Sequence, residues 1–262
     1  MQSISAVIIT FNEELFIGKC LESLEGIADE IIVVDSFSTD STVDICKKYG
    51  VRLVQHEFTG FMDQKNYSLT LASNKYVLSL DADEALSEDL RKSVAEIKNN
   101  ILADGYYVNR LNNFCGKWMR HSAWYPDKQL RLFNKDKGAW GPINVHETFQ
   151  LKPGSKISRL KGDLLHWTFT SKNEFSEKIE HFSQIAANDY FKAGKKVSFI
   201  TPAIHMIWRF FLNYFLHLGF MDGRYGYTVC WQGARSSFLK YSMLRKLNRN
   251  AGKKARSKHE LY

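Results

Sequence analysis

Residues 78–86 read LSLDADEAL. The first three of them are the end of an apolar run at residues 76–80. The run has the length and continuity of a strand buried on both faces. Three acids follow it at once, Asp81, Asp83 and Glu84. The stretch therefore predicts a buried strand that ends in concentrated negative charge, and such charge needs a cation nearby.

Three further apolar runs of strand length precede this one, at residues 4–10, 31–34 and 51–54. Helical patterns separate the four runs, the last of them at residues 62–72. Apolar strands that alternate with helices predict an α/β protein with a mostly parallel sheet covered on both faces. Ligands bind beyond the carboxyl ends of the strands in such sheets.

Polar residues predict where the first two helices begin and end. Thr10 and Glu13 fit the Ser/Thr-x-x-Glu capping box of a first helix, which would stop near Gly26. Asp40 is expected to cap a second helix, which Gly50 closes. Both helices would then start directly after their strands.

The pattern changes from about Asp104 to short strands joined by aromatic and Gly-rich turns. We expect strands at GYYVNR (105–110), KQLRLF (128–133), NVHETF (144–149) and DLLHWTF (163–169), which would form a mixed second half of the sheet. A helix is expected over residues 173–193, with Phe175, Ile179, Phe182 and Ala186 on one stripe.

Residues 204–221 are rich in Trp, Phe and Leu, with a polar residue at every fourth position: His205, Arg209, Asn213 and His217. On a helix these four form a polar stripe opposite an aromatic face. The stretch is too short and too polar for a membrane span. It predicts either an interfacial helix on a membrane or a helix packed on the main domain or on a second subunit.

The net charge of +8 is concentrated at the C-terminus, because residues 240–262 hold eight basic residues and one acid. Such a basic arm suits nucleic acid or anionic lipid, and the alternative is a solvated tail. The four cysteines form no CxxC pair, and no basic segment precedes the short apolar run at the N-terminus. We therefore expect reduced thiols and a cytoplasmic protein, peripheral on the cytoplasmic face of the inner membrane if the arm binds lipid.

Asp81 and Asp83 straddle a single residue after the fourth strand. This spacing can direct both carboxylates toward one hard cation, and a site with few protein ligands suits Mg²⁺ or Mn²⁺ that also binds a diphosphate. The alternative is an ordinary acidic turn before a helix that Ser87 starts.

Four motifs stand in the order and spacing of a known family: VIITFNEE (7–14), VVDSFSTDST (33–42), Lys65-Asn66 and the Asp-x-Asp at 81–83. The chain resembles a family 2 glycosyltransferase with the GT-A fold. Four later stretches resemble β-glucosyltransferases of the lipopolysaccharide core and other envelope glycans: WYPDKQLRLFN (124–134), VHE (145–147), LLHW (164–167) and GFMDGRYGY (219–227). The resemblance implies a GT-A catalytic domain at residues 1–198, with a nucleotide-binding half at 1–100 and an acceptor half at 101–198. A C-terminal helical region with the basic tail would occupy residues 199–262.

The resemblance also implies roles for individual residues. The nucleotide of a UDP-sugar would contact Thr10, Phe11, Asn12, Glu13, Asp35, Lys65 and Asp81. Asp83 would be the main metal ligand, joined by Asp81 and by His166, whose alternative is a core histidine bonded to backbone.

An inverting transfer needs a base for the acceptor hydroxyl. The Glu-Asp pair that many family members use is missing here, so we expect Glu147 in this role, with Asp127 as the second choice. Arg131 could bind the diphosphate or pair with an acid of the sheet, and Trp124 could stack on a sugar or pack within a loop.

These expectations describe a metal-dependent inverting enzyme that moves a hexose, most simply glucose, from a UDP-sugar to a lipopolysaccharide or other envelope-glycan acceptor. One rival is a catalytically idle relative that serves as a scaffold in envelope glycan assembly, although its Asp-x-Asp is intact. A nucleic-acid-binding protein is the other rival, and it is disfavoured because the basic residues are confined to the tail.

Overall fold

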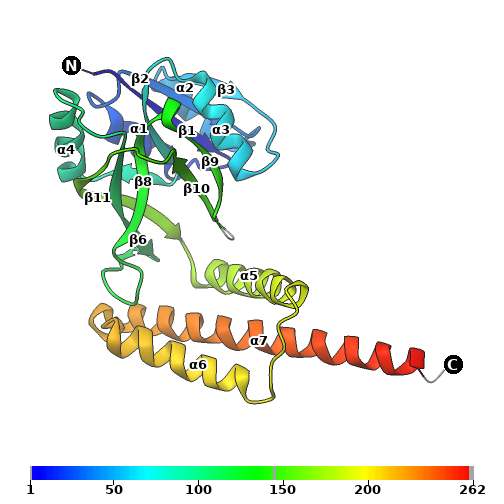
Figure 1. Ribbon diagram of the computed structural model, residues 1–262. Helices are drawn as coiled ribbons and strands as arrows, with labels where there is room; N and C mark the ends of the chain where they lie inside the picture. Colours follow the sequence, from blue (N-terminus) through cyan, green and yellow to red (C-terminus); the bar gives the residue numbers. More distant parts are fainter. Residues whose placement is uncertain (1, 144–145, 260–262) are drawn as a thin grey trace. The chain divides into compact units, whose positions relative to one another are not determined.

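The structure is a computed structural model that describes residues 2–143 and 146–259 (Figure 1). For residues 142, 143, 146 and 253–259 it describes the backbone alone. Residues 144 and 145 of the expected strand at 144–149, and the end of the basic tail, lie outside the described residues. The chain divides into two compact units, Met1–Asn112 with Pro126–Thr168, and Asn113–Tyr125 with Phe169–Tyr262.

Four parallel strands form the first half of the main sheet, in the order β3-β2-β1-β4. They are β1 (Ile4–Thr10), β2 (Glu30–Asp35), β3 (Arg52–Gln55) and β4 (Tyr76–Asp81). In the register of the sheet, Thr10 lies beside Asp35, and Ile9 lies beside Asp81. The carboxyl ends of three strands therefore meet at one edge, as the sequence predicts.

The second half of the sheet is antiparallel, and the order continues from β4 as β8-β6-β11-β5. These strands are β5 (Glu84–Leu86), β6 (Gly105–Phe114), β8 (Asp127–Asn134) and β11 (Ile157–Phe169). Within the described residues the sheet has nine strands, the ninth being β7 (Lys117–Trp118) beside β6. β9 (Gly138–Ile143) and β10 (His146–Leu151) form a separate hairpin, and a short 3₁₀ turn at Lys135–Lys137 precedes it. Three of the four expected strands lie in this half of the sheet, whereas residues 146–149 of the fourth belong to the separate hairpin.

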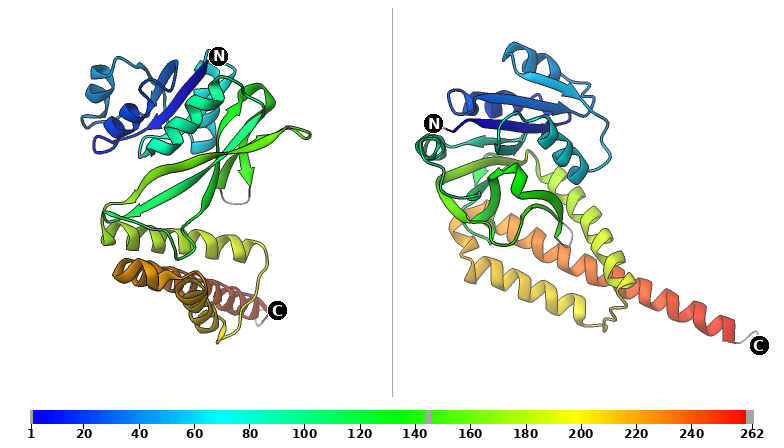
Figure 2. Two further views of the ribbon diagram at one scale, coloured as in Figure 1. Left: turned by 90° about the vertical axis from the view of Figure 1, so that its left-hand side faces the viewer. Right: turned by 45° about the horizontal axis from the view of Figure 1, so that its top comes forward.

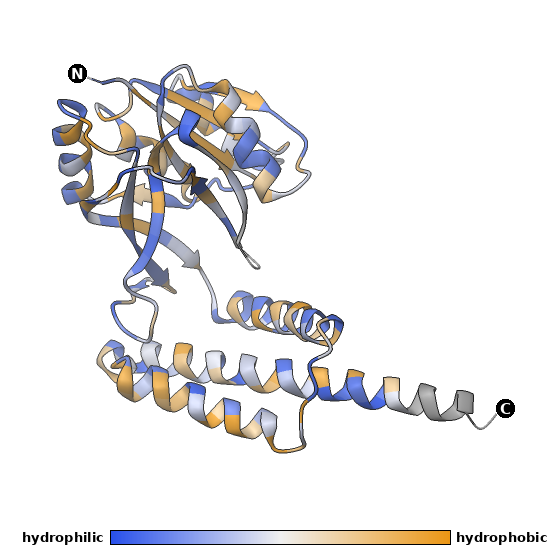
Figure 3. Ribbon diagram, viewed as in Figure 1, coloured by the Kyte–Doolittle hydropathy of each residue, from blue (hydrophilic) through white to orange (hydrophobic). Residues whose placement is uncertain are grey.

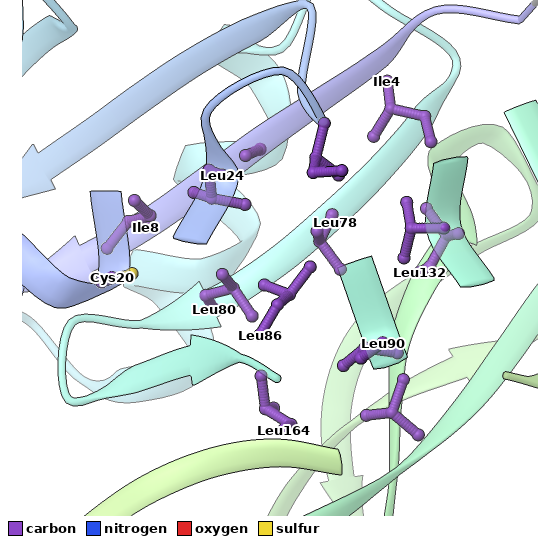
Figure 4. Close-up of a cluster of buried hydrophobic side chains, with 14 of the residues drawn as sticks. Ile4, Ile8, Cys20, Leu24, Leu78, Leu80, Leu86, Leu90, Leu132 and Leu164 are labelled. Carbon is purple, nitrogen blue, oxygen red and sulfur yellow. The ribbon is translucent and has the colours of Figure 1, made fainter. Parts of the chain in front are cut away.

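Helices cover both faces of the parallel strands because residues of β1 point alternately to either side. Ile8 packs with residues of α1 (Ile17–Leu24) and α4 (Glu88–Lys98), including Leu24 and Leu90 (Figure 4). Val7 packs on the other face with Leu69 of α3 (Phe61–Leu71). The remaining helix of this unit is α2 (Thr42–Lys48).

The helix starts differ from the sequence prediction. The capping box at Thr10 is wrong, because Thr10 is the last residue of β1 and α1 begins only at Ile17. Ser41 rather than Asp40 is the N-cap of α2, although the Oδ1 of Asp40 accepts a hydrogen bond of 3.0 Å from the N–H of Thr42. In both cases a polar loop, rather than the helix, directly follows the strand.

The second unit contains three long helices, α5 (Lys172–Lys192), α6 (Thr201–Phe211) and α7 (Gly223–His259). α7 packs against α5 along one side and against α6 along the other (Figures 1 and 2). A π-helical turn at Leu212–Leu216 and a 3₁₀ turn at Gly219–Asp222 connect α6 to α7. None of the helices in the described part of the chain is both long enough and apolar enough to cross a membrane.

Two expectations for this region need correction. The single helix expected over residues 204–221 is interrupted, because Leu218 adopts a left-handed conformation with φ 54°. The buried stripe of α5 runs through Ser183 and Ala187 rather than Phe182 and Ala186, and the Phe182 side chain is exposed. The boundary of the catalytic domain at residue 198 stays a prediction, while α5 belongs to the second compact unit, where it packs with α7.

We predict that Gly162→Ala lowers the free energy of unfolding by about 3 kcal/mol or more. Gly162 has φ +88°, and a Cβ there would lie 2.2 Å from the backbone nitrogen of Leu90. Gly154 is the matched control, since its φ is +84° but nothing lies within 4 Å of the added Cβ. Gly154→Ala should cost only the conformational penalty of about 1 kcal/mol. Equal losses for the two variants in urea titrations would contradict this account of the β11–α4 contact.

Candidate active site

A cavity of about 320 Å³ opens at the edge where the strands of the first unit end. It is lined by the ends of β1, β2 and β4, by the start of α3 and by β11: Ile9, Thr10, Phe11, Glu13, Ser36, Phe58, Phe61, Gln64, Asp81, Ala82, Asp83 and His166. Apolar and aromatic side chains share the wall with three carboxylates and an imidazole. Such a mixture is typical of a small-molecule site.

The loops after β1 and β2 are tied together beside this cavity. The N–H of Asn12 donates to Ser38 Oγ at 2.8 Å, and Asn12 Oδ1 accepts a hydrogen bond of 2.8 Å from the N–H of Thr39. Asn12 and Phe37 both have left-handed backbones, with φ 53° and 61°. Strained backbone of this kind concentrates at functional sites.

Asp35 is fully buried at the end of β2. Its carboxylate accepts hydrogen bonds from the N–H and the hydroxyl of Ser38, and one of 3.3 Å from Gln55 Nε2. The side chain therefore fixes the turn that carries Ser36 to the cavity wall. Direct contact between Asp35 and a nucleotide stays a prediction.

Lys65 of α3 is buried, and its Nζ lies 3.1 Å from Asp81 Oδ1 and 3.7 Å from Glu147 Oε1. The neighbouring Asn66 exchanges two hydrogen bonds of 3.0 Å with the backbone of Trp140 in β9. The Lys65-Asn66 dipeptide thus joins the hairpin to the end of β4, and it places a positive charge behind the cavity.

A second buried cation, Arg131 of β8, bridges two acids of the opening stretch. Its Nη2 lies 3.0 Å from Asp81 Oδ2 and 2.6 Å from Glu84 Oε1. Glu84 also accepts a hydrogen bond of 3.0 Å from the N–H of Asp81 and lies 3.4 Å from Arg110 Nη1. Arg110 in turn holds Asp127 at 2.7 Å. Acids and cations therefore alternate from Lys65 to Asp127.

This arrangement controls the charge of Asp81. Burial raises the pKa of its carboxyl group, but the charges and hydrogen bonds of Lys65 and Arg131 outweigh burial and hold the pKa well below its usual range. Burial lowers the pKa of Arg131, and the charges of Glu84 and Asp81 reverse that effect and raise it. Both groups stay ionised at neutral pH.

Asp83 points to a different partner, since its Oδ2 lies 3.3 Å from His166 Nε2. His166 Nδ1 lies 2.6 Å from Asn112 Oδ1, which can only accept a hydrogen bond, so the ring proton sits on Nδ1. In the neutral ring, Nε2 would then present a lone pair to the Asp83 carboxylate. Two acceptors that face each other need a cation or a proton between them.

A divalent metal ion fits this pair, because a carboxylate and a neutral imidazole with a fixed second nitrogen are common metal ligands. No cluster of three or more His, Cys, Asp or Glu side chains able to hold a metal occurs in the described residues. The protein would therefore supply two ligands at most here. Asp81 is paired with Lys65 and Arg131, which favours a nucleotide-side role for it over the metal role.

The family model of glycosyl transferase family 2 matches residues 5–151. The chain belongs to this family. An uncharacterized glycosyltransferase of Rickettsia bellii is 34% identical over 98% of this chain and 90% of its own length. The lipopolysaccharide core biosynthesis glycosyltransferase LpsC of Rhizobium meliloti is 30% identical over 90% of this chain and 89% of its own length. The protein is thus a glycosyltransferase related to an enzyme of lipopolysaccharide core biosynthesis.

Solved structures with a similar fold include S. aureus TarS, with a TM-score of 0.48 and 19% identity. The match covers 88% of this chain and 55% of that TarS chain. TarS 1–349 in complex with UDP-GlcNAc has a TM-score of 0.47 and 15% identity, with 95% and 92% of the two chains covered. The GT-A class that the resemblance implied for this family 2 glycosyltransferase is confirmed: four parallel strands continue into an antiparallel second half, and a helical part follows at the C-terminus.

The two expected base candidates have different surroundings in this glycosyltransferase. Glu147 does not line the cavity, but its carboxylate is partly exposed and shares Lys65 with Asp81. The oxygens of Asp127 are occupied by Arg110 and by Gln129 Nε2 at 2.7 Å. Glu147 is therefore the freer of the two to accept a proton.

The two residues expected to bind substrate, Arg131 and Trp124, both contact other residues of the protein. Arg131 is buried between Asp81 and Glu84, the sheet-acid alternative of its prediction. Trp124 belongs to the second unit, where it packs against Phe114 and Phe175. A contact of either residue with a sugar or diphosphate stays a prediction.

Three functional candidates escaped the sequence prediction. Phe58 and Phe61 line the cavity with largely exposed rings, 5.0 Å apart between centroids. Gln64 lines it as well and donates to Ser36 Oγ at 3.0 Å. The one available signal is the aromatic repeat in FTGF at residues 58–61, which a surface loop would not need.

We predict that Asp81→Asn lowers the free energy of unfolding by about 3 kcal/mol at pH 7, because it leaves two buried cations short of a partner. The folded-state pKa of Asp81 is depressed. Its stabilisation is therefore complete above the unfolded-state value of about 3.9 and is lost as the pH falls below it. In urea titrations the gap between wild type and Asp81→Asn should narrow from pH 7 to pH 3.

Asp44→Asn is the matched control, since Asp44 is an exposed acid 3.6 Å from Lys47. Its stability should stay close to wild type at both pH values. An Asp81→Asn gap that is unchanged or larger at pH 3 would contradict the proposed charge balance.

Proposed function

We propose that this glycosyltransferase transfers a hexose from a UDP-sugar to a saccharide of the cell envelope, with inversion at the anomeric carbon and with the help of a divalent metal ion. The observation that carries the proposal is the placement of Asp83 and His166 on the wall of the same cavity as Asp81 and the exposed aromatic rings. The metal ion, the diphosphate and the nucleobase would then bind in one cavity.

The cavity wall suits a pyrimidine nucleotide. Phe11, Phe58 and Phe61 offer exposed rings on which a base can stack. The Thr10 hydroxyl lines the cavity and is buried with no hydrogen-bond partner in the described part of the chain. Unsatisfied polar groups of this kind are natural partners for a ligand.

Mg²⁺ or Mn²⁺ bound by Asp83 and His166 would neutralise the diphosphate as it leaves with the nucleotide. Diphosphate oxygens and water would complete the coordination, because the protein offers two ligands. Asn112 keeps the His166 ring in the tautomer that a metal requires.

Glu147 is our choice for the base that takes the proton of the acceptor hydroxyl. Its place beside Lys65 ties it to the end of β4, where the donor would bind. A single displacement with one base inverts the anomeric carbon, so an α-linked UDP-sugar would give a β-linked product. The relationship to LpsC supports a lipopolysaccharide core or similar lipid-linked saccharide as acceptor.

We predict that calorimetry with UDP, GDP and dTDP finds UDP binding strengthened by Mn²⁺. Asp83→Asn should abolish the Mn²⁺ effect, keep metal-free UDP binding and lower transfer about a hundredfold or more. UDP-glucose should serve as donor in preference to UDP-galactose or UDP-GlcNAc. Asp44→Asn, an exposed acid outside the cavity, is the control and should behave as wild type. If Asp83→Asn transfers sugar at the wild-type rate, Asp83 is not a metal ligand.

We predict that Glu147→Gln lowers kcat by about a hundredfold or more while UDP-sugar binding is kept, since only proton removal is lost. The acidic limb of the pH–rate profile should disappear with it. Asp127→Asn is the comparison variant and should retain most of the activity. If Glu147→Gln keeps the wild-type kcat and Asp127→Asn loses most of it, Asp127 rather than Glu147 is the base.

A further inference from the structure

The outer side of α6 presents an apolar face that no part of the described chain covers. Ile204, Ile207, Trp208, Phe211 and Phe215 recur at helical spacing and are all exposed. The exposed fractions of Ile207 and Trp208 are 70% and 57%. We call these five residues the α6 face. Figure 3 shows how hydrophobic residues gather along α6, whereas α7 is hydrophilic beyond it.

This exposure is not explained by loose packing of α6. The opposite side of the helix is already occupied, because Phe210 packs edge-on against Tyr227 and Trp231 of α7. Asn213, expected on an outward polar stripe, is instead buried. The helix therefore has one apolar side that is packed on α7 and a second one that faces solvent. Exposed apolar surfaces of this extent mark an interaction site.

Basic residues are frequent in the sequence on either side of the α6 face. From Lys195 to Gly252 the sequence has nine basic residues and one acid, Asp222. That acid is buried and accepts hydrogen bonds from His121. Residues 195–252 therefore contribute no exposed acid, although one of their cations, Arg235, is paired with Glu180 of α5.

One contact brings a cation close to an exposed aromatic residue at the start of α6. The Arg245 guanidinium lies 4.5 Å from the ring centroid of Phe199, an exposed residue just before α6. Arg245 also lines a shallow hollow with Lys246 and Arg249, and among the described residues no acid lines it. Three cations around one hollow repel one another unless anions lie nearby.

We propose that the α6 face binds the surface of an anionic lipid bilayer, with α6 in the plane of the interface. The headgroup boundary accepts Trp, Ile and Phe side chains, and lipid phosphates neutralise the surrounding cations. A second copy of the chain would cover the apolar side chains but would bring two positively charged surfaces together. The membrane satisfies both the apolar and the charged residues.

The inference extends the proposed function by naming the surface that would bring the enzyme to a lipid-linked acceptor. Lipid binding needs neither a sugar donor nor a metal ion. A failure of the proposed transfer reaction and a failure of membrane binding would therefore be distinguished by separate measurements.

The test is flotation of the full chain with vesicles of phosphatidylcholine alone or mixed with phosphatidylglycerol. Wild type should bind the mixed vesicles and should bind the neutral ones far more weakly. The double variant Ile207→Ser, Trp208→Ser should reduce the partition coefficient about tenfold or more. Arg245→Ser with Arg249→Ser should reduce it about fivefold per charge, for the anionic vesicles alone.

A matched control removes two exposed apolar residues from the first unit, Leu102→Ser and Ile157→Ser. It should float as wild type does. All variants should keep the wild-type Tm and UDP affinity, because the changed side chains lie outside the cavity. Wild-type flotation of Ile207→Ser, Trp208→Ser would overturn the proposal. A dimer in lipid-free sedimentation that this variant dissociates would overturn it too, since the α6 face would then join two copies.

Discussion

The buried guanidinium of Arg131, held between Asp81 and Glu84, is the interaction on which the catalytic unit depends. Acids this close together in sequence would repel one another at the end of β4 unless cations reached them. The chain supplies those cations from three other elements, with Lys65 on α3, Arg131 on β8 and Arg110 on β6. The antiparallel half of the sheet is therefore bound to the parallel half by charge as well as by backbone hydrogen bonds.

The same arrangement gives the acids at the end of β4 different surroundings. Asp81 and Glu84 are neutralised by protein cations, so they can define the back of the site without drawing a metal ion. Among the described residues no Lys or Arg is paired with Asp83, whose carboxylate faces Nε2 of His166. A metal ion brought in with a diphosphate would thus meet one carboxylate that no Lys or Arg neutralises, and the binding of metal and nucleotide would then be mutually dependent.

The sequence was sufficient for the parallel half of the fold, because uninterrupted apolar runs and the polar residues that end them are local signals. It also brought Asp35, Asp81 and Asp83 to one edge. It could not assign Glu84, whose partners Arg110 and Arg131 lie 26 and 47 residues away and follow no period. The capping box failed for a related reason, since Thr10 satisfies a local pattern while pairing with β2 extends the strand through it. In the second unit, hydropathy identified the aromatic side of α6 but not which side would pack on α7.

If the second unit binds a membrane as proposed, attachment would affect the two substrates differently. The UDP-sugar would be a soluble anion whose access depends on the cavity alone, so membrane attachment would leave its affinity unchanged. A lipid-linked acceptor is confined to the bilayer, and an enzyme held on the same surface meets it at a much higher effective concentration. Weak contacts between the catalytic unit and the acceptor would then be sufficient for transfer, because the membrane holds the enzyme and the acceptor close together.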